Sequence, residues 1–200
     1  MNYLKLLLFL FCISLHPITA ECQTKAKVKT QKAVQVAKLN VPLFGKSIKV
    51  DDGDTFIFLD KNNRQIKIRI EGIDAPEKGM PYARKSKEYL AGLLLNQDLV
   101  VVGKSYDQYK RMVAQISVGK QDVSAAMIAS GYAWHYKKFN QEKKLSDLEL
   151  KAKSQRLGLW QENSPMPPWK VRAYRRAGYS DAEFRMLRKQ NSPAIRKYLE

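Results

Sequence analysis

Residues 47–70 read SIKVDDGDTFIFLDKNNRQIKIRI, and three short segments of this stretch have the pattern of β-strands. Ser47 to Val50, Thr55 to Leu59 and Gln65 to Ile70 carry β-branched or aromatic residues at alternate positions. The last two segments flank Asp60-Lys61-Asn62-Asn63, whose residue types are typical of a tight turn. The stretch therefore predicts one strand followed by a β-hairpin.

Further elements are predicted after the hairpin. Apolar residues at helical spacing predict helices over Tyr82 to Leu95, Val123 to Ser130 and Gln141 to Arg156. Leu99 to Val102 and Met112 to Val118 have the composition of strands. This order suits a mainly β fold with α-helices (α+β), in which a five-stranded OB-fold barrel carries about three packed helices. Loops at the mouth of such a barrel are the natural place for a functional site.

The N-terminal segment, Met1 to Ala20, has the features of a secretory signal peptide. A positive charge at Lys5 precedes the apolar run from Leu6 to Leu15, and small residues lie near Ala20. About ten apolar residues are too few to cross a bilayer, which needs about 20. We predict cleavage after Ala20 and a secreted or periplasmic protein; retention of the segment as an anchor is the alternative.

Composition divides the rest of the chain into three parts. We place a basic flexible linker at residues 21–45, an OB-fold domain at 46–162 and a basic C-terminal extension at 163–200. The extension has two helix start signals: a capping box beginning at Ser180, and Ser192 followed by proline. We expect short basic helices there.

The charge of the chain indicates a polyanionic partner. Lys and Arg total 36 against 19 acidic residues, which gives a formal net charge of +17. Nucleic acid, an anionic membrane and an acidic polysaccharide all fit this composition, and a solubilising role for the lysines is the simplest alternative.

Three carboxylates surround a glycine at the start of the second strand. Asp51, Asp52 and Asp54 flank Gly53, and like charges this close need a cation or solvent between them. An ordinary Asx-turn at the Asp-Gly pair is the alternative interpretation.

A second acidic cluster follows the hairpin. Arg69 lies on the strand that leads into a loop with Asp74 and Glu77, and Pro76 restricts the backbone between these two carboxylates. Two acidic loops beside adjacent strands can converge on one hard cation, whereas scattered surface charge is the alternative. A third segment, Asp107 to Arg111, places an arginine and a tyrosine directly before a strand.

Taken together, the three segments resemble the staphylococcal nuclease (thermonuclease) family. The shared pattern is DGDT at Asp52 to Thr55, R-x4-D-x-P-E at Arg69 to Glu77 and D-x-Y-x-R at Asp107 to Arg111. The resemblance covers Ser47 to Trp160. It implies a calcium-dependent phosphodiesterase that hydrolyses DNA and RNA as an endonuclease and exonuclease, acting as a monomer without a stable protein partner.

The resemblance also implies a metal site. Asp54, Asp74 and the carbonyl of Ala75 would bind Ca²⁺, with Asp52 and Thr55 supporting these ligands. Oxygen donors are the ligands that Ca²⁺ prefers. Ala75 stands where the best-known member of the family has threonine, a change of little consequence if only the carbonyl binds the metal.

The same resemblance implies the catalytic and substrate-binding residues. Glu77 would activate the attacking water, while Arg69 and Arg111 would hold the phosphate. Guanidinium groups stabilise the charge that develops on phosphate oxygens in the transition state. Residues beside the substrate would be Tyr109, Lys110 and Tyr136. Lys110 replaces a family glycine, and His135 is expected to pack or hydrogen-bond rather than to catalyse.

Two other functions stay open on the sequence alone. The first is a non-catalytic nucleic-acid-binding OB-fold module, and the second is a basic protein that attaches to surfaces through its tails. A pure binder of polyanions gains nothing from carboxylates on its binding face, because each repels phosphate unless a cation intervenes. The acidic clusters therefore favour the nuclease.

Overall fold

The computed structural model describes residues 37–198. The predicted signal peptide and most of the predicted linker fall on residues 1–36, outside the described residues. Within the described range, none of the helices combines the length and the apolar composition needed to cross a membrane.

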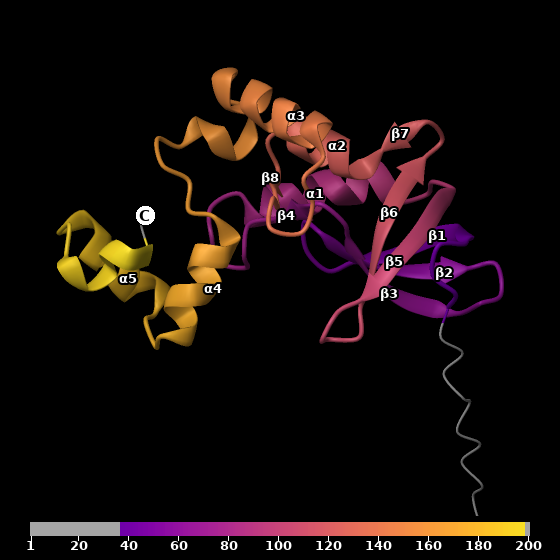
Figure 1. The fold of residues 1–200 in the computed structure, drawn as a ribbon, viewed down its shortest axis with the longest axis horizontal. Helices are drawn as coiled ribbons and strands as arrows, with labels where there is room; N and C mark the ends of the chain where they lie inside the picture. Colours follow the sequence, from indigo (N-terminus) through magenta and orange to yellow (C-terminus); the bar gives the residue numbers. More distant parts are fainter. Residues whose placement is uncertain (1–36, 199–200) are drawn as a thin grey trace, which may run out of the picture. The chain divides into compact units, whose positions relative to one another are not determined.

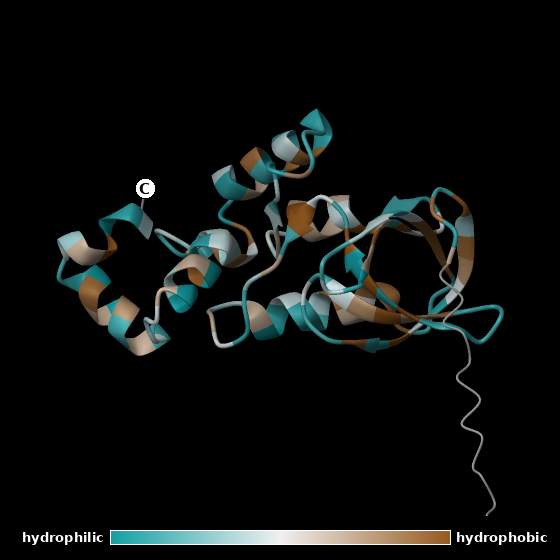
Figure 2. Ribbon diagram, turned by 60° about the horizontal axis from the view of Figure 1, so that its bottom comes forward, coloured by the Kyte–Doolittle hydropathy of each residue, from teal (hydrophilic) through white to brown (hydrophobic). Residues whose placement is uncertain are grey.

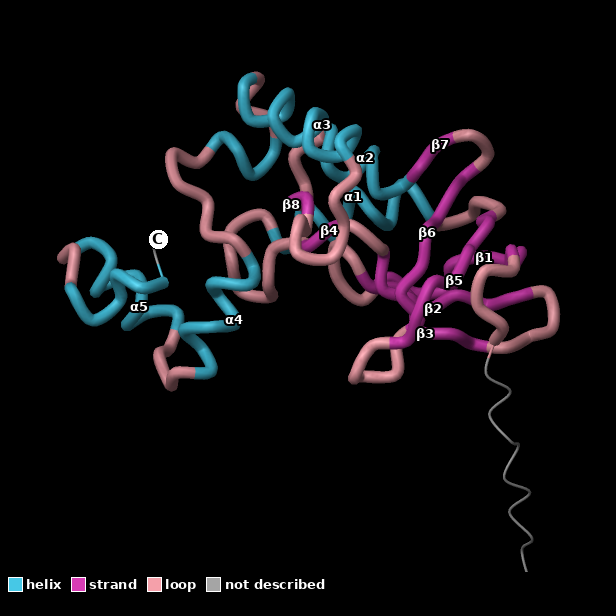
Figure 3. The backbone as a smooth tube through the Cα atoms, in the orientation of Figure 1, coloured by secondary structure: helices cyan, strands magenta, loops and turns pink. Residues whose placement is uncertain are grey.

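Five strands form a closed barrel, as the sequence predicts. They are β1 (Pro42–Val50), β2 (Thr55–Asp60), β3 (Gln65–Ile70), β5 (Leu99–Tyr106) and β6 (Met112–Val118). Neighbours pair antiparallel in the order β3-β2-β1-β5-β6, and β3 also pairs with β6 in parallel. This last pairing closes the sheet, which protects the edges of these five strands (Figures 1 and 3). The predicted OB-type α+β fold is confirmed.

Alternating side chains of the strands fill the barrel. Phe56 and Phe58 of β2, Ile68 and Ile70 of β3 and Met112 of β6 are almost completely buried. Figure 2 shows the corresponding hydrophobic segments along the barrel strands. The alternation that predicted these strands is therefore the pattern that builds the core.

Three helices pack against the barrel core. They are α1 (Ala83–Leu94), α2 (Val123–Ala129) and α3 (Lys143–Ser154). Each contributes buried apolar residues to the core, among them Leu90 of α1, Met127 of α2 and Leu145 of α3. All three lie within the ranges predicted from helical spacing.

Short elements complete this part of the chain. They are β4 (Ile73–Asp74), β7 (Gln121–Asp122), β8 (Trp134–His135) and the 3₁₀ helix η1 (Gly158–Gln161). β4 pairs antiparallel with β8, so that Asp74 lies opposite Trp134. This two-stranded pairing fixes the backbone of one predicted metal ligand.

The first strand begins earlier than predicted. β1 starts at Pro42 rather than Ser47, and Ala37 is already buried in the core. The residues from Pro42 to Gly45 pair with β5, which itself runs on to Tyr106. The end of the predicted linker is thus part of the barrel, because pairing with a distant strand orders a segment whose own pattern is weak.

The C-terminal extension has its own small core. Its helices are α4 (Pro168–Arg176), α5 (Asp181–Lys189) and the 3₁₀ helix η2 (Pro193–Tyr198). The capping box at Ser180 is present, whereas the start at Ser192 leads into a 3₁₀ helix, and α4 was not predicted. Four buried residues form the core: Val171, Tyr174, Phe184 and Ile195.

A hydrogen-bonded carboxylate ties α4 to α5. Arg175 donates to both oxygens of Asp181 at 2.8 Å, and the hydroxyl of Tyr174 donates to Asp181 Oδ1 at 2.7 Å. The hydrogen bonds from Arg175 lower the pKa of Asp181 to about 2. These contacts therefore favour the ionised form of Asp181.

We predict that Asp181 titrates near pH 2 in the folded protein. Its folded pKa lies below the ordinary value of 3.8, so its stabilising effect is full above pH 3.8 and is lost as the pH falls through about 2. A carbon-detected NMR titration of the Asp181 carboxyl measures this directly. In Arg175→Gln the midpoint should rise toward 3.8, and an unchanged midpoint would contradict the assignment.

Candidate active site

The turn between β1 and β2 separates two aspartates. Asp52 Oδ1 accepts a hydrogen bond from the backbone N–H of Asp54 at 3.1 Å, which is the Asx-turn considered as the alternative for this segment. A Cβ atom on Gly53 would collide with Ser86 Oγ of α1, so only glycine fits here. The turn is therefore an Asx-turn at Asp52, and it also directs Asp54 into the protein.

Asp54 is a buried carboxylate with three partners. Its Oδ2 lies 2.5 Å from Arg69 Nη1 and accepts from the N–H of Ala75 at 2.9 Å, while its Oδ1 accepts from the hydroxyl of Thr55 at 2.9 Å. Burial alone would raise the pKa of Asp54, but the charge and hydrogen bonds of Arg69 outweigh burial and hold this pKa below its usual range. Asp54 is thus ionised at neutral pH.

Arg69 joins the two acidic loops. Besides Asp54, its guanidinium binds Asp74 Oδ1 at 2.9 Å and the carbonyl of Ile73 at 3.3 Å. The pKa of Asp74 is raised, first by burial and then by the charge of Asp54, although neighbouring guanidinium groups oppose the rise. The structure therefore brings together the two carboxylates that the sequence placed in separate loops.

Glu77 and Asp74 share a second guanidinium that the sequence analysis missed. Arg172 of α4 donates from Nη1 to Glu77 Oε1 at 2.6 Å and from Nη2 to Asp74 Oδ2 at 2.6 Å. Arg175 Nη1 lies 3.9 Å from the other Glu77 oxygen. Both oxygens of Asp74 are thereby bound by arginines. No local signal distinguishes Arg172 from the other basic residues of the extension.

Arg111 is held by Asp107 and Thr55. Its Nε donates to Asp107 Oδ2 at 2.7 Å, and its Nη1 donates to Thr55 Oγ1 at 3.3 Å. Tyr109 is 70% exposed, with its ring 5.4 Å from the Arg111 guanidinium carbon. Lys110 has a φ of 61°, a conformation that glycine adopts without strain, which fits the family's glycine at this position.

One cavity of about 1260 Å³ connects most of the predicted site. The predicted residues that line it are Asp52, Asp54, Arg69, Ala75, Glu77, Tyr109, Arg111 and Tyr136. Asp74 and Thr55 are almost fully buried and do not line the cavity. They hold two residues that do, since Asp74 binds Arg69 and Thr55 binds Asp54. The predicted substrate contact Lys110 is not among the lining residues, whereas Arg172 is.

The exposed end of the turn carries a perturbed acid. The pKa of Asp52 is raised to about 6, chiefly because protein atoms displace water from its carboxyl group and then because the charge of Asp54 repels a second negative charge. The residue as a whole is exposed, so this carboxyl remains open to the cavity. A cation in the cavity would favour its ionised form.

The two residues of β8 are structural, as expected for His135. His135 is buried, and its ring nitrogens lie 3.0 Å from Ser146 Oγ and 3.1 Å from Asn140 Oδ1. Trp134 is 5% exposed and packs edge-to-face on Trp160. Neither has the surroundings of a catalytic group.

Comparison with known proteins agrees with this geometry. A family model described as staphylococcal nuclease homologue matches residues 67–162. An uncharacterized endonuclease of Haemophilus influenzae is 35% identical over 121 residues, which cover 60% of this chain and 68% of that protein. A micrococcal nuclease of Shigella flexneri is 30% identical over 162 residues, which cover 74% of this chain and 92% of that protein. An uncharacterized endonuclease of Escherichia coli O157:H7 is 34% identical, covering 64% and 83%.

The chain belongs to the staphylococcal nuclease family. This membership supports a nuclease function and nucleic-acid substrates. The stretch that matches the family model includes Arg69, Asp74, Glu77 and Arg111, but it ends before α4. Arg172 therefore lies outside the stretch that matches the family model, although it binds Asp74 and Glu77 within that stretch.

We predict that Arg69→Met destabilises the fold by about 3–5 kcal/mol, because it leaves buried Asp54 and Asp74 without their shared counter-charge. Urea denaturation in a chelating buffer measures the change. Arg84→Met is the matched control: Arg84 forms an exposed ion pair with Glu88, and its loss should cost less than about 1 kcal/mol. Equal effects of the two substitutions would contradict the assignment.

Proposed function

We propose that the chain is a calcium-dependent phosphodiesterase that cleaves DNA and RNA, both within strands and at their ends. The observation that supports this most strongly is the meeting of Asp54 and Asp74, from two separate loops, at the guanidinium of Arg69, which lines one cavity together with Asp54, Glu77 and Arg111. Carboxylates at the binding face of a polyanion are favourable only when a cation neutralises them.

The donor set fits a hard divalent cation. Asp54 and Asp74 offer carboxylate oxygens within reach of one guanidinium, and Ala75, which lines the cavity, offers a backbone carbonyl. Across residues 37–198 there is no group of three or more His, Cys, Asp and Glu side chains arranged for a metal. Water would therefore complete the ligand shell, as is common for Ca²⁺. Asp52 and Thr55 would support these ligands from the turn.

Glu77 is the proposed general base. Its Oε1 is held by Arg172 at 2.6 Å, while its Oε2 has a longer contact of 3.9 Å to Arg175. Oε2 is thus the oxygen placed to accept the proton of a water that attacks phosphorus. A bound calcium ion would add charge stabilisation at the phosphate oxygens. As the new P–O bond forms, the P–O bond to the leaving oxygen would break; that oxygen would take a proton from solvent, and Glu77 would return its own proton to solvent.

Two arginines are proposed to hold the phosphate. Both Nη atoms of Arg69 bind carboxylates. Arg111, which lines the cavity, is anchored to Asp107 through Nε and to Thr55 through Nη1, so its Nη2 is the atom proposed to bind the phosphate. Guanidinium forks stabilise developing negative charge in the plane of the phosphate oxygens. Tyr109, Tyr136 and Lys110 are proposed to lie along the substrate. The predicted signal peptide supports a secreted or periplasmic enzyme, which we propose acts as a monomer.

We predict that purified protein degrades plasmid DNA with Ca²⁺ and stops when a chelator is added. Glu77→Gln should lower the rate by about 100-fold or more, because general bases contribute at least this factor. Glu77 is a better target than Arg69, because its loss leaves the Asp54–Arg69–Asp74 pairing intact. The exposed Glu88→Gln is the control and should act like the unmodified protein. Full activity of Glu77→Gln would exclude its role.

Arg172 should compete with the cation. Arg172 binds Asp74 Oδ2 and Glu77 Oε1. A cation at Asp74 would therefore find Oδ2 already hydrogen-bonded and a positively charged guanidinium group beside it. We predict that Arg172→Gln raises the Ca²⁺ affinity by about tenfold, equivalent to about 1.4 kcal/mol of competition removed. Calorimetric titration without nucleic acid measures this. Arg176→Gln, on the same helix and with the same change in charge, is the control; equal affinities of the two variants would refute direct competition.

A further inference from the structure

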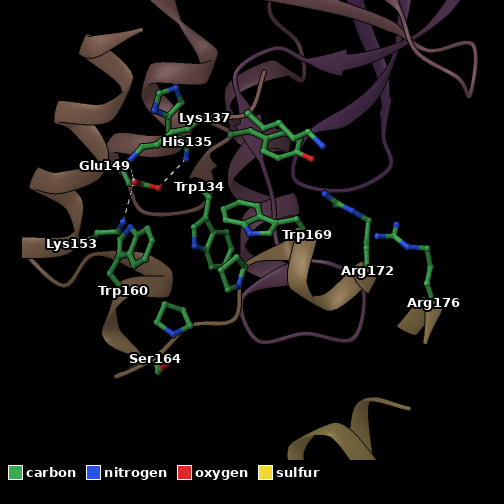
Figure 4. A pocket seen from close by; sticks show the side chains of 14 residues that line it. Trp134, His135, Lys137, Glu149, Lys153, Trp160, Ser164, Trp169, Arg172 and Arg176 are labelled. Carbon is green, nitrogen blue, oxygen red and sulfur yellow. Dashed lines mark hydrogen bonds and ion pairs between the residues drawn. The ribbon is translucent and has the colours of Figure 1, made fainter. Parts of the chain in front are cut away.

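A second cavity adjoins the catalytic one. It measures about 740 Å³ and is formed by residues of β8, α3, η1 and α4 and of the loops beside them (Figure 4). Trp134, Trp160 and Trp169 all line it. Figure 4 shows these three indoles gathered on one side of the cavity, with Arg172 and Arg176 extending from α4 on the other. The cavity therefore combines aromatic faces with guanidinium groups.

The charge of this cavity is almost entirely positive. Its basic residues are Lys137, Lys138, Lys153, Arg172 and Arg176, and its acidic residue is Glu149. Glu149 is neutralised by Lys153 at 3.0 Å and Lys137 at 3.3 Å, and it also accepts from the backbone N–H of His135. Unlike the catalytic cavity, this one has no pair of carboxylates, in its described lining, that would hold a cation. Its chemistry is suited to binding an anion rather than to cleaving one.

The two cavities share a wall. Tyr136, Arg172 and Arg176 line both of them. The Tyr136 ring lies 4.9 Å from Phe139, which lines the catalytic cavity, and 5.6 Å from Trp169, which lines the second one. Tyr136 and Trp169 are nearly parallel, with 7° between their planes. A row of aromatic rings thus leads from one cavity to the other.

Arg172 and Arg176 lie one helical turn apart on α4 and face the same side. Arg172 is engaged with Asp74 and Glu77, whereas Arg176 is exposed and has no hydrogen bond or ion pair with any residue between 37 and 198. A guanidinium without a protein partner, in a cavity that also offers the ring of Trp169, is a suitable receptor for a phosphate that follows a stacked base.

We propose that the second cavity binds the part of a single-stranded nucleic acid that lies next to the cleaved bond, with a base stacked on Trp169 and a phosphate bound by Arg176. This proposal rests on the proposed nuclease function. Single strands are the ligand because paired bases hide the faces that aromatic side chains use. An acidic peptide would use the arginine but not the ring, and it is an outcome of the test.

The test measures binding in chelating buffer, where no cleavage occurs. Fluorescence anisotropy compares a thymidine dinucleotide with a single strand of about 12 thymidine nucleotides, a length within the range covered by one OB fold. The full chain should bind the longer strand more tightly. Trp169→Ala should lose about tenfold in affinity for the longer strand, as expected for one base–aromatic stack. The dinucleotide should be bound equally by the variant and the unmodified chain.

Two further variants separate stacking from charge. Arg176→Gln should also weaken binding of the longer strand. The plot of log affinity against log salt concentration should become less steep by about 0.7, the value for one phosphate contact of a single strand. Trp169→Ala should leave this slope unchanged, and Trp169→Phe should restore most of the affinity because phenylalanine still stacks. Trp169→Phe and the exposed Arg176→Gln also keep the test valid if Trp169→Ala fails to fold.

The matched control is Arg196→Gln, which removes an exposed arginine of the same extension that lines neither cavity. It should bind both oligonucleotides like the unmodified chain. The proposal is overturned if Arg196→Gln weakens binding as much as Arg176→Gln, or if neither Trp169→Ala nor Arg176→Gln has an effect. It is also overturned if poly-glutamate of similar length displaces the strand and its own affinity falls equally in these two variants. Absence of cleavage with Ca²⁺ would refute the nuclease proposal separately, because the binding test is carried out in chelating buffer, without Ca²⁺.

Discussion

The site depends on one buried arginine between two buried carboxylates. Moving such charges out of water is costly, and Arg69 offsets this cost only because both partners lie within hydrogen-bonding distance. Barrel closure provides this geometry. Thr55 of β2 pairs with Arg69 of β3, and the parallel pairing of β3 with β6 fixes the strand from its other side. The pairing of β4 with β8 then places Asp74 beneath the same guanidinium. Without the pairing of β3 with β6, these charged groups would be free to move apart.

Four carboxylates, those of Asp52, Asp54, Asp74 and Glu77, gather at this centre, and this fits the proposed cation better than a phosphate alone. Asp54, Asp74 and Glu77 lie within ion-pair distance of three guanidinium groups, those of Arg69, Arg172 and Arg175. The pKa values of Asp52 and Asp74 are raised chiefly by burial and then by the charge of Asp54. A protein that only bound nucleic acid would gain nothing from such carboxylates at its binding face.

The sequence predicted the elements and clusters whose residues lie close together in the chain. The strand Met112 to Val118 has the predicted limits, because alternation and burial coincide there. The candidate clusters were found because their carboxylates and arginines lie close together in the chain. The start of β1 was missed, because Pro42 to Gly45 is ordered by pairing with β5 and not by its own composition. Arg172 was missed for the same kind of reason: its partners Asp74 and Glu77 lie more than 90 residues away, and only the fold brings them together.

The C-terminal extension presents its arginines from a rigid element rather than from a loop. Val171 and Tyr174 of α4 are buried against Phe184 and Ile195, so the helix is held by its own core while Arg172 reaches Asp74 and Glu77. Because Arg172 and Arg176 are one turn apart on this helix, a movement of α4 that frees Asp74 must also displace Arg176. On the proposed function, cation binding at Asp74 and strand binding in the second cavity would be linked through such a movement of α4, and by reciprocity each would change the affinity for the other.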